Sequence, residues 1–331
     1  PPPPPPPTPT FFNDTATTEI YTERNSSAAS DVYKRQALSF EVDDADGLAA
    51  GQVMQINWYN PEGESGSFLE QLYGDSDVTI GSHHWNFPKL PLSRQQALIE
   101  AVSGNRVTIK SPLLHDVDTR WNVDLVAWRH LEEVGFEHFR ITFPPHPYVA
   151  HHVEPGFNGI YLTGLFNGWV RDVVIGNADS AILTEGISNV TIERVTTEGS
   201  SLAHYSVQLG GVHNILVKDL VVENPVKHPL SFNTFANKSV YQNAFVRHAP
   251  VLDQHAGANH HNLFDHTRVQ VELDQSATTP GYALFMGGGA GYWKPSHGIN
   301  TTFWNTEVVF TNGALSEQPI LLNGMEDGPG A

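Results

Sequence analysis

The chain has 331 residues, no cysteine and a formal net charge of −18. The lack of cysteine excludes disulfide bonds and thiolate metal sites. The negative charge disfavours binding to nucleic acid or to anionic lipid. No run of residues approaches the roughly 18 to 20 continuous apolar residues of a membrane-spanning helix, so we expect neither nucleic acid nor membrane as a partner.

Residues 1–36 differ in composition from the rest of the chain. Seven prolines precede two polar stretches, residues 10–22 and 26–36, which resemble translated sequencing-adapter read-through. We therefore interpret residues 1–36 as a non-native or disordered segment, and we expect the native N-terminus, with any signal peptide, to have been lost. The alternative is a proline-rich linker in the polyproline conformation.

Residues 37–125 are expected to form a separate strand-rich segment. Apolar and polar residues alternate over residues 38–42, 52–58, 77–80 and 106–110, and glycine, asparagine, aspartate or proline bounds each run. This pattern predicts short strands. One helix is expected from Ser93 to Val102, with Ser93 as its N-cap and Gly104 just beyond its end.

A repeat begins near residue 134. Seven segments each consist of an apolar residue, two polar residues and a small or apolar residue, and the steps between them are 34, 22, 25, 24, 23 and 39 residues. The segments are Phe136–Phe139, Val170–Val173, Ile192–Val195, Val217–Leu220, Tyr241–Ala244, Phe264–Thr267 and Phe303–Thr306.

This period predicts an all-β fold, a right-handed parallel β-helix over residues 126–331 that forms a single-stranded solenoid. Asparagines precede five of the repeats, where the coil must turn. The long steps predict loop excursions around residues 144–157 and 274–297. We expect the solenoid to be truncated at its C-terminal end.

Repeats such as Gly186–Val195 resemble those of the pectin-lyase-like superfamily over roughly residues 100–311. Segments 262–265 and 302–305 are similar to those of uncharacterised bacterial members. The resemblance implies a carbohydrate-active enzyme, chiefly a polysaccharide lyase or a glycoside hydrolase, although some members are not enzymes. The polygalacturonase signatures and the Arg-x-Pro-x-x-Arg pattern of calcium-dependent pectate lyases are both missing from this sequence.

Residues at equal offsets in successive coils of a parallel β-helix stack roughly 4.8 Å apart. Counted from the ends of three successive repeats, His204 lies at offset +9, His228 at +8 and Asp253 at +9. His255 lies at offset +11, where the preceding coil has Ser231. We predict that His204, His228, Asp253 and His255 line a groove for a saccharide, although a purely structural polar stack would give the same pattern.

A lyase needs a base and a group that neutralises the substrate carboxylate. We assign the base to His228 or His255 and the proton donor to Tyr205. Lys227, Asn233 or a bound divalent cation such as Ca²⁺ would neutralise the carboxylate, and no cofactor is otherwise expected.

Three further segments carry candidate residues. Residues 248–266 contain five histidines and two carboxylates, which suit a divalent metal, although the spacing matches no closed zinc site. His151, His152 and Glu154 in the first loop could add a ligand to the groove. In the glycine-rich loop 287–297, substrate contacts are expected from Tyr292, Trp293, Lys294 and His297, although its aromatic residues could instead form the core of a lid.

We therefore expect a monomeric, secreted or periplasmic bacterial protein that acts on a polysaccharide or oligosaccharide. The leading hypothesis is a polysaccharide lyase that cleaves an acidic substrate by β-elimination. A glycoside hydrolase would pair Asp253 with a second carboxylate about 5 to 9 Å away. The remaining alternative is a non-catalytic glycan-binding or structural β-helix.

Overall fold

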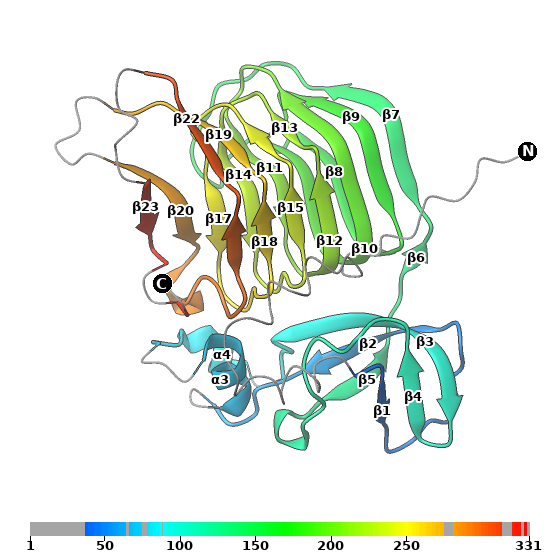
Figure 1. The fold of residues 1–331 in the computed structure, drawn as a ribbon. Helices are drawn as coiled ribbons and strands as arrows, with labels where there is room; N and C mark the ends of the chain where they lie inside the picture. The colour runs from blue at the N-terminus through cyan, green and yellow to red at the C-terminus, as the bar shows by residue number, and fades with distance from the viewer. Residues whose placement is uncertain are drawn as a thin grey trace, which may run out of the picture.

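A computed structural model describes residues 37–63, 66–74, 78–87, 89–274, 281–312, 320–325 and 328–329. The predicted non-native segment, residues 1–36, lies outside the described residues. The described chain forms a small N-terminal unit beside a large solenoid of β-strands (Figure 1). None of the helices formed by these residues is long and apolar enough to cross a membrane.

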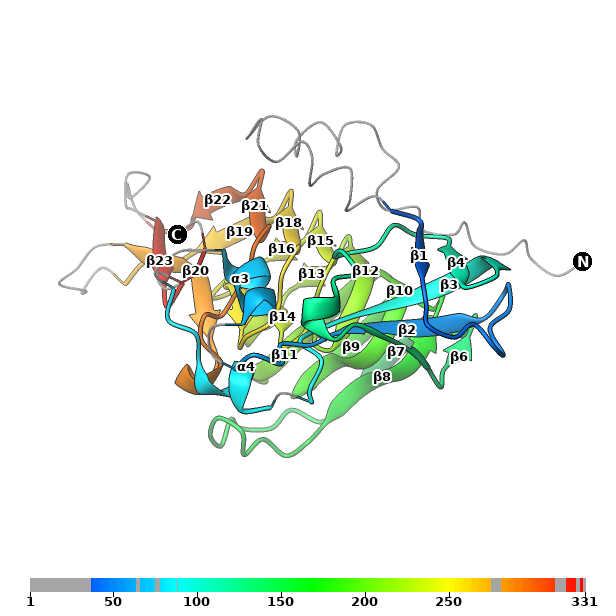
Figure 2. The same cartoon turned by 90° about the horizontal axis from the view of Figure 1, so that it is seen from below.

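The N-terminal unit is an antiparallel sheet with two short helices packed beside it (Figures 1 and 2). Its strand order is β1-β4-β3-β2-β5. The sheet comprises β1 (Ser39–Glu41), β2 (Val53–Trp58), β3 (Ser93–Ser103), β4 (Arg106–Ile109) and β5 (Asp124–Ala127), and the helices are α3 (Ser67–Tyr73), α4 (Ser82–Asn86) and the 3-10 turn η1 (Thr119–Trp121).

The helix expected from Ser93 to Val102 is wrong, because these residues form the central strand β3. Between Ser93 and Ile99 all residues except Arg94 and Leu98 are buried, including Gln95. The Gln95 side chain donates a hydrogen bond to Pro112 O and accepts one from Leu114 N. Strand pairing therefore outweighs the helix propensity of this segment. The strand expected at residues 77–80 is also absent over its described part, 78–80.

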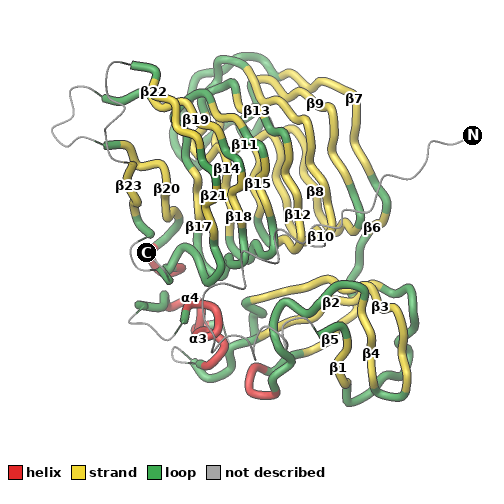
Figure 3. Tube along the Cα trace, viewed as in Figure 1, coloured by secondary structure: helices red, strands yellow, loops and turns green. Residues whose placement is uncertain are grey.

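The solenoid is a right-handed parallel β-helix, which confirms the predicted fold class. Ser180 pairs in parallel with Asn158, 22 residues earlier, and with Tyr205, 25 residues later. Because each partner lies one coil away, the chain winds as a helix of strands rather than as a simple barrel. Figure 3 shows these strands stacked along the axis of the solenoid.

Three parallel sheets make up the solenoid, and β8, β9 and β10 each run through more than one of them. The first sheet contains β8 (Asn158–Phe166), β10 (Ser180–Glu198), β11 (Ala203–Leu209), β14 (Val226–Asn233), β17 (Leu252–His255), β20 (Tyr282–Gly288) and β23 (Ile320–Asn323).

The second and third sheets continue the same coils. The second adds β6 (Leu131–Glu132), β12 (Val212–Lys218), β15 (Val240–Gln242), β18 (Leu263–Asp265) and β21 (Thr302–Trp304). The third adds β7 (Gly135–Thr142), β9 (Trp169–Gly176), β13 (Val221–Val222), β16 (Phe245–Val246), β19 (Arg268–Val271) and β22 (Glu307–Phe310).

The corner between the second and third sheets explains the sequence repeat. The third residue of every repeat has a positive φ, between 51° and 60°. These residues are His138, Asp172, Arg194, Asp219, Asn243, His266 and Asn305. The first residue of each of the five inner repeats is fully buried in the core. A left-handed residue at each corner therefore keeps the repeats in register. Upstream, Asn214 Nδ2 donates to Asn189 Oδ1 over 2.6 Å.

The core of the solenoid consists of stacked aliphatic and aromatic side chains. Phe264 stacks on Tyr241 and on Phe303, with ring centroids 5.5 and 5.1 Å away. Complete burial of one such side chain contributes roughly 1.5–3 kcal/mol. These stacks make a rigid support for the side chains on the outer face of the first sheet.

Candidate functional site

The candidate site lies on the first sheet, where β11, β14 and β17 run side by side. The loop between β7 and β8, residues 143–157, covers one edge of it. The sheet contributes His204, His228, Asp253 and His255, the four residues predicted as the groove. The structure brings these four together, although their catalytic roles stay predictions.

Asp253 is the centre of the arrangement and is only 1% exposed. Its Oδ2 accepts hydrogen bonds from Ser231 Oγ over 2.6 Å and from His255 Nδ1 over 3.2 Å. His228 Nδ1 also lies 3.2 Å from Oδ2. That contact lacks the alignment of a hydrogen bond. Burial acts to raise the pKa of Asp253, but His228 and His255 outweigh it and hold the pKa at about 2.

Tyr205 lies between His204 of its own coil and His228 of the following coil. Its ring stacks on His204, with centroids 4.3 Å apart, and on His228, with centroids 5.3 Å apart. Asn233 Nδ2 donates to Tyr205 Oη over 3.3 Å. Burial, followed by the charge of Asp253, raises the pKa of Tyr205, so this phenol keeps its proton at neutral pH.

His204 connects the sheet to the covering loop. Its Nδ1 donates to Glu154 Oε1 over 3.0 Å, while its buried Nε2 has no hydrogen-bond partner among the described residues. The ring of His151 lies 4.5 Å from that of His204 and 5.8 Å from that of His228. Burial lowers the pKa of His204 to about 4, against the opposing effect of Glu154, so the imidazole is neutral at pH 7.

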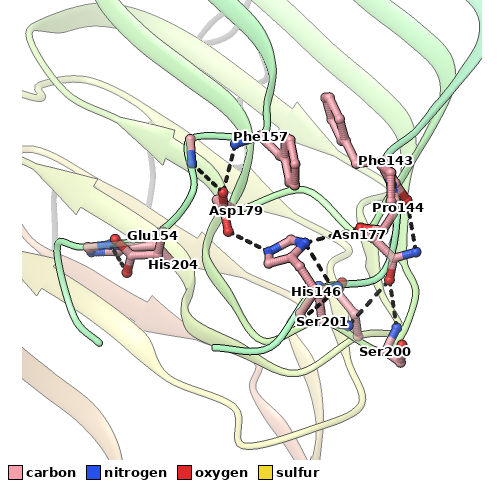
Figure 4. A network of polar contacts seen from close by, with 12 residues as sticks. Phe143, Pro144, His146, Glu154, Phe157, Asn177, Asp179, Ser200, Ser201 and His204 are labelled. Carbon is pink, nitrogen blue, oxygen red and sulfur yellow. Dashed lines mark hydrogen bonds and ion pairs between the residues drawn. The ribbon is translucent and has the colours of Figure 1, made fainter. Parts of the chain in front are cut away.

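A buried network fixes the loop over the site (Figure 4). Asp179 Oδ2 accepts the backbone N–H groups of Gly156 and Phe157, each over 2.7 Å, and Oδ1 accepts from His146 Nε2 over 2.7 Å. His146 Nδ1 donates to Pro144 O over 3.2 Å. Burial opposes the charge on this ring, but these two hydrogen bonds raise the pKa of His146. The network holds residues 144–157 in the position that places Glu154 against His204.

The predicted neutralising residues border the cluster. Lys227 Nζ lies 5.5 Å from the centre of the Tyr148 ring, on the covering loop, and its charge acts on His151. Asn233 pairs in register with His255 and bonds to Tyr205. Lys227 is exposed, so it is free to turn toward a bound anion.

The glycine-rich loop leaves the cluster after its first residues. The ring of Tyr292 lies 4.0 Å from that of His83, and Trp293 contacts His84 and Phe235. Lys294 Nζ donates to Gly287 O over 3.2 Å.

His297 Nε2 donates to Pro329 O over 3.3 Å. The aromatic pair therefore packs on α4, and the contacts of Lys294 and His297 resemble those of a lid core rather than of a substrate groove.

The predicted register is wrong by two residues. Equal offsets put His228 opposite Ala203 and Asp253 opposite Pro229, whereas the structure pairs His228 with Tyr205 and Asp253 with Ser231. His255 pairs with Asn233 instead of Ser231. The groove residues nevertheless meet, because histidine side chains are long enough to span neighbouring positions of the sheet.

The histidine-rich segment 248–266 does not form one centre. Only Asp253 and His255 join the site, and His228 completes that group. His260 faces the N-terminal unit, where its Nε2 lies 2.9 Å from His115 Nε2. Asp265 bonds to Gln242 on the second sheet. The sequence distances in this segment are short, but successive residues leave on different sheets of the coil.

Sequence reasoning missed Asp179 and His146 and gave little weight to Glu154. All three depend on how the long excursion before β8 docks, which a repeat period does not encode. The signal that could have found them is the concentration of histidines at positions 146, 151 and 152 in one excursion.

No protein-family model matches the sequence, and a search of curated proteins gave no match. Three solved structures share 13–14% identity with it. The tailspike protein gp49 from Pseudomonas phage LKA1 matches with a TM-score of 0.32, and the Pseudomonas phage phi297 tailspike gp61 matches with 0.29. The gp54 tailspike of Acinetobacter baumannii bacteriophage AP22, in complex with A. baumannii capsular saccharide, matches with 0.37. The matches cover 83–88% of this chain but only 54–61% of those chains. Identities and TM-scores this low support no functional assignment.

Proposed function

We propose that the protein is a polysaccharide lyase that cleaves an acidic polysaccharide by β-elimination at the His204–His228–Asp253–His255 cluster. The single observation that carries the proposal is the buried, ionised Asp253 with His228 and His255 on its Oδ2, beside the protonated phenol of Tyr205. The cluster thus offers a base and an acid within one coil spacing. Membership of the pectin-lyase-like superfamily is part of this proposal.

The reaction assigns one proton to each group. As the base, Nε2 of His255 or His228 removes the proton from the carbon α to the uronate carboxylate, and Asp253 stabilises the imidazolium that results. The glycosidic C–O bond breaks as the C=C bond forms, and Tyr205 Oη protonates the departing oxygen. Lys227 neutralises the substrate carboxylate, which makes the proton acidic enough to remove.

The electrostatics favour elimination over hydrolysis. A glycoside hydrolase needs one carboxylic acid that keeps its proton at working pH, usually because its pKa is raised. Here the two carboxyl groups of the site both have lowered pKa values. The pKa of Asp253 is held at about 2. Burial opposes ionisation of Glu154, but hydrogen bonds from backbone N–H groups and from His204 lower its pKa.

A non-catalytic glycan-binding role is the second alternative. Binding sites of that kind use exposed aromatic rings, whereas the rings here are interleaved with titratable groups. One structural neighbour is described as a complex with a capsular saccharide, but the proposal rests on the site residues. Action on such a substrate would place the protein in the periplasm or outside the cell, and a monomeric state is part of the proposal.

The test is ultraviolet absorbance of the unsaturated uronate, measured over a panel of acidic polysaccharides. His255→Gln and His228→Gln are each expected to lower kcat by about 100-fold or more, since a general base contributes about 10²–10⁴-fold. Tyr205→Phe is expected to lower kcat with little change in KM, because the phenol acts on the leaving group.

The matched control is His248→Gln, because His248 is exposed and lies outside the cluster. Its activity should equal that of the unchanged protein. If polysaccharides bind but neither unsaturated products nor new reducing ends appear, the lyase proposal fails and the binding role takes its place. New reducing ends without unsaturation would instead favour hydrolysis.

A further inference from the structure

We propose that His151, His204 and His228 form a binding site for a transition-metal ion such as Zn²⁺. One ring nitrogen from each of the three residues lies within 4.8 Å of one ring nitrogen of the other two. Three imidazoles and open positions for water or substrate are the ligand set of many catalytic zinc sites. Nitrogen ligands favour zinc or a similar ion over Ca²⁺, which prefers oxygen ligands.

Two of the three imidazoles have a carboxylate behind them. His204 Nδ1 donates to Glu154, and His228 Nδ1 lies 3.2 Å from Asp253. Metal-binding histidines almost always give their second nitrogen to such a partner, which fixes the ring and makes the free nitrogen a better ligand. The same arrangement leaves Nε2 of both rings available.

The buried Nε2 of His204 gives an independent reason for a ligand at this point. The side chain of His204 is 8% exposed, and its Nε2 has no hydrogen-bond partner among the described residues. A buried polar atom without a partner costs about 1–3 kcal/mol. A metal ion bound at Nε2 would satisfy it.

The overlapping group of His228, Asp253 and His255 is a weaker candidate. Its side chains already contact one another, and Asp253 accepts two hydrogen bonds. The His151, His204 and His228 rings contact one another without hydrogen bonds between them. His151 lies on the covering loop and is exposed, so it can close on an ion with little rearrangement.

The site would add a cation to the proposed reaction. An ion bound at Nε2 of His228 would leave His255 as the base of the proposed reaction, and it would neutralise the substrate carboxylate together with Lys227. The metal proposal does not require lyase activity, because binding is measured without substrate.

The experiment uses the full chain, freed of metal with a chelator. Zn²⁺ is added in competition with a chromophoric chelator, and Co²⁺ is added separately to record its visible absorption. We expect one Zn²⁺ per chain and the intense absorption of four-coordinate Co²⁺. His204→Gln and His151→Gln are each expected to weaken Zn²⁺ binding by more than about 100-fold, and Glu154→Gln by about 10–100-fold.

His248→Gln is the control and should bind Zn²⁺ as the unchanged protein does. His151→Gln also guards against misfolding, since an exposed loop residue can be replaced without disturbing the core. The proposal would be overturned if the His151 and His204 variants bound Zn²⁺ as tightly as the unchanged protein does. The proposal would also be overturned if His255→Gln abolished Zn²⁺ binding while His151→Gln left it unchanged. That result would assign the ion to the group of His228, Asp253 and His255. Zn²⁺ binding with no lyase activity would overturn only the proposed function.

Discussion

Gly288 shows how a single residue sets the space available at the site. It pairs in register with His255, and a Cβ atom there would lie 2.5 Å from His255 Nδ1 and 2.9 Å from Asp253 Oδ1. Contacts that short force a neighbour to move. The absence of a side chain at this position therefore lets β20 pair with β17 without displacing the Asp253–His255 pair.

We expect Gly288→Ala to lower the free energy of unfolding by about 1–3 kcal/mol, the usual cost of overpacking. The proposed lyase activity should fall as well, because His255 must turn away from Asp253. Gly291→Ala is the matched control, since a Cβ at Gly291 would have no atom within 4 Å. Equal unfolding curves for the two variants in denaturant would contradict this account.

The site residues differ in how far the sequence could predict them. His204, His228, Asp253 and His255 recur at nearly constant offsets, so the coil period was enough to bring them together. Glu154 reaches the site only because Asp179 fixes the covering loop. Contacts of that kind depend on the docking of a long excursion, for which neighbouring coils give no template.

At the scale of elements, the corners of the coils follow from backbone conformation. Asn, Asp, His and Arg occupy a left-handed conformation at each corner between the second and third sheets. The polar pair of each repeat lies at this corner, which is why the repeat can be recognised in the sequence. The central strand β3 could not be predicted in the same way, because its glutamine, alanine and leucine residues favour a helix. Pairing with β2 and β4 stabilises the strand instead.

His266 gives a test of the corner conformation, since its φ is 51° and its side chain is exposed. A β-branched residue tolerates this conformation poorly, whereas glycine adopts it readily. We expect His266→Val to be less stable than His266→Gly by about 1–2 kcal/mol in denaturant unfolding. The control pair is His248→Val and His248→Gly, at an exposed position without positive φ. If the two pairs show the same difference, the corner is not strained.

At the scale of the whole molecule, the N-terminal unit packs on the turns of the solenoid through buried histidines. His260 Nδ1 donates to Ala258 O, and its Nε2 lies 2.9 Å from His115 Nε2 and 3.3 Å from Ser93 Oγ. Across the same junction, Tyr73 Oη accepts a hydrogen bond from Ala258 N over 2.8 Å, and within the N-terminal unit the same oxygen lies 2.7 Å from His84 Nε2. Sequence patterns within each unit do not predict this junction, because it is made by residues more than a hundred positions apart.

The junction should make the fold sensitive to acid. Burial lowers the pKa of His260 and of His84 from 6.5 to about 4, and that of His213, within the solenoid, to about 3. The folded protein therefore holds these rings neutral, while the unfolded chain binds protons below pH 6.5. The contribution of these neutral rings to the free energy of unfolding is fully present above pH 6.5. It is lost as the pH falls toward 4, by about 1.4 kcal/mol per pH unit for each ring.

We expect the free energy of unfolding in denaturant to fall as the pH is lowered from about 6.5 to about 4, since these rings take up protons on unfolding. His260→Gln removes one of them, so the slope should decrease by about 1.4 kcal/mol per pH unit, whatever the variant does to stability at pH 7. His248→Gln is the control and should leave the slope unchanged, because His248 is exposed and lies outside the junction. The same slope in the His260 variant would mean that His260 is already protonated in the folded protein, which its complete burial argues against.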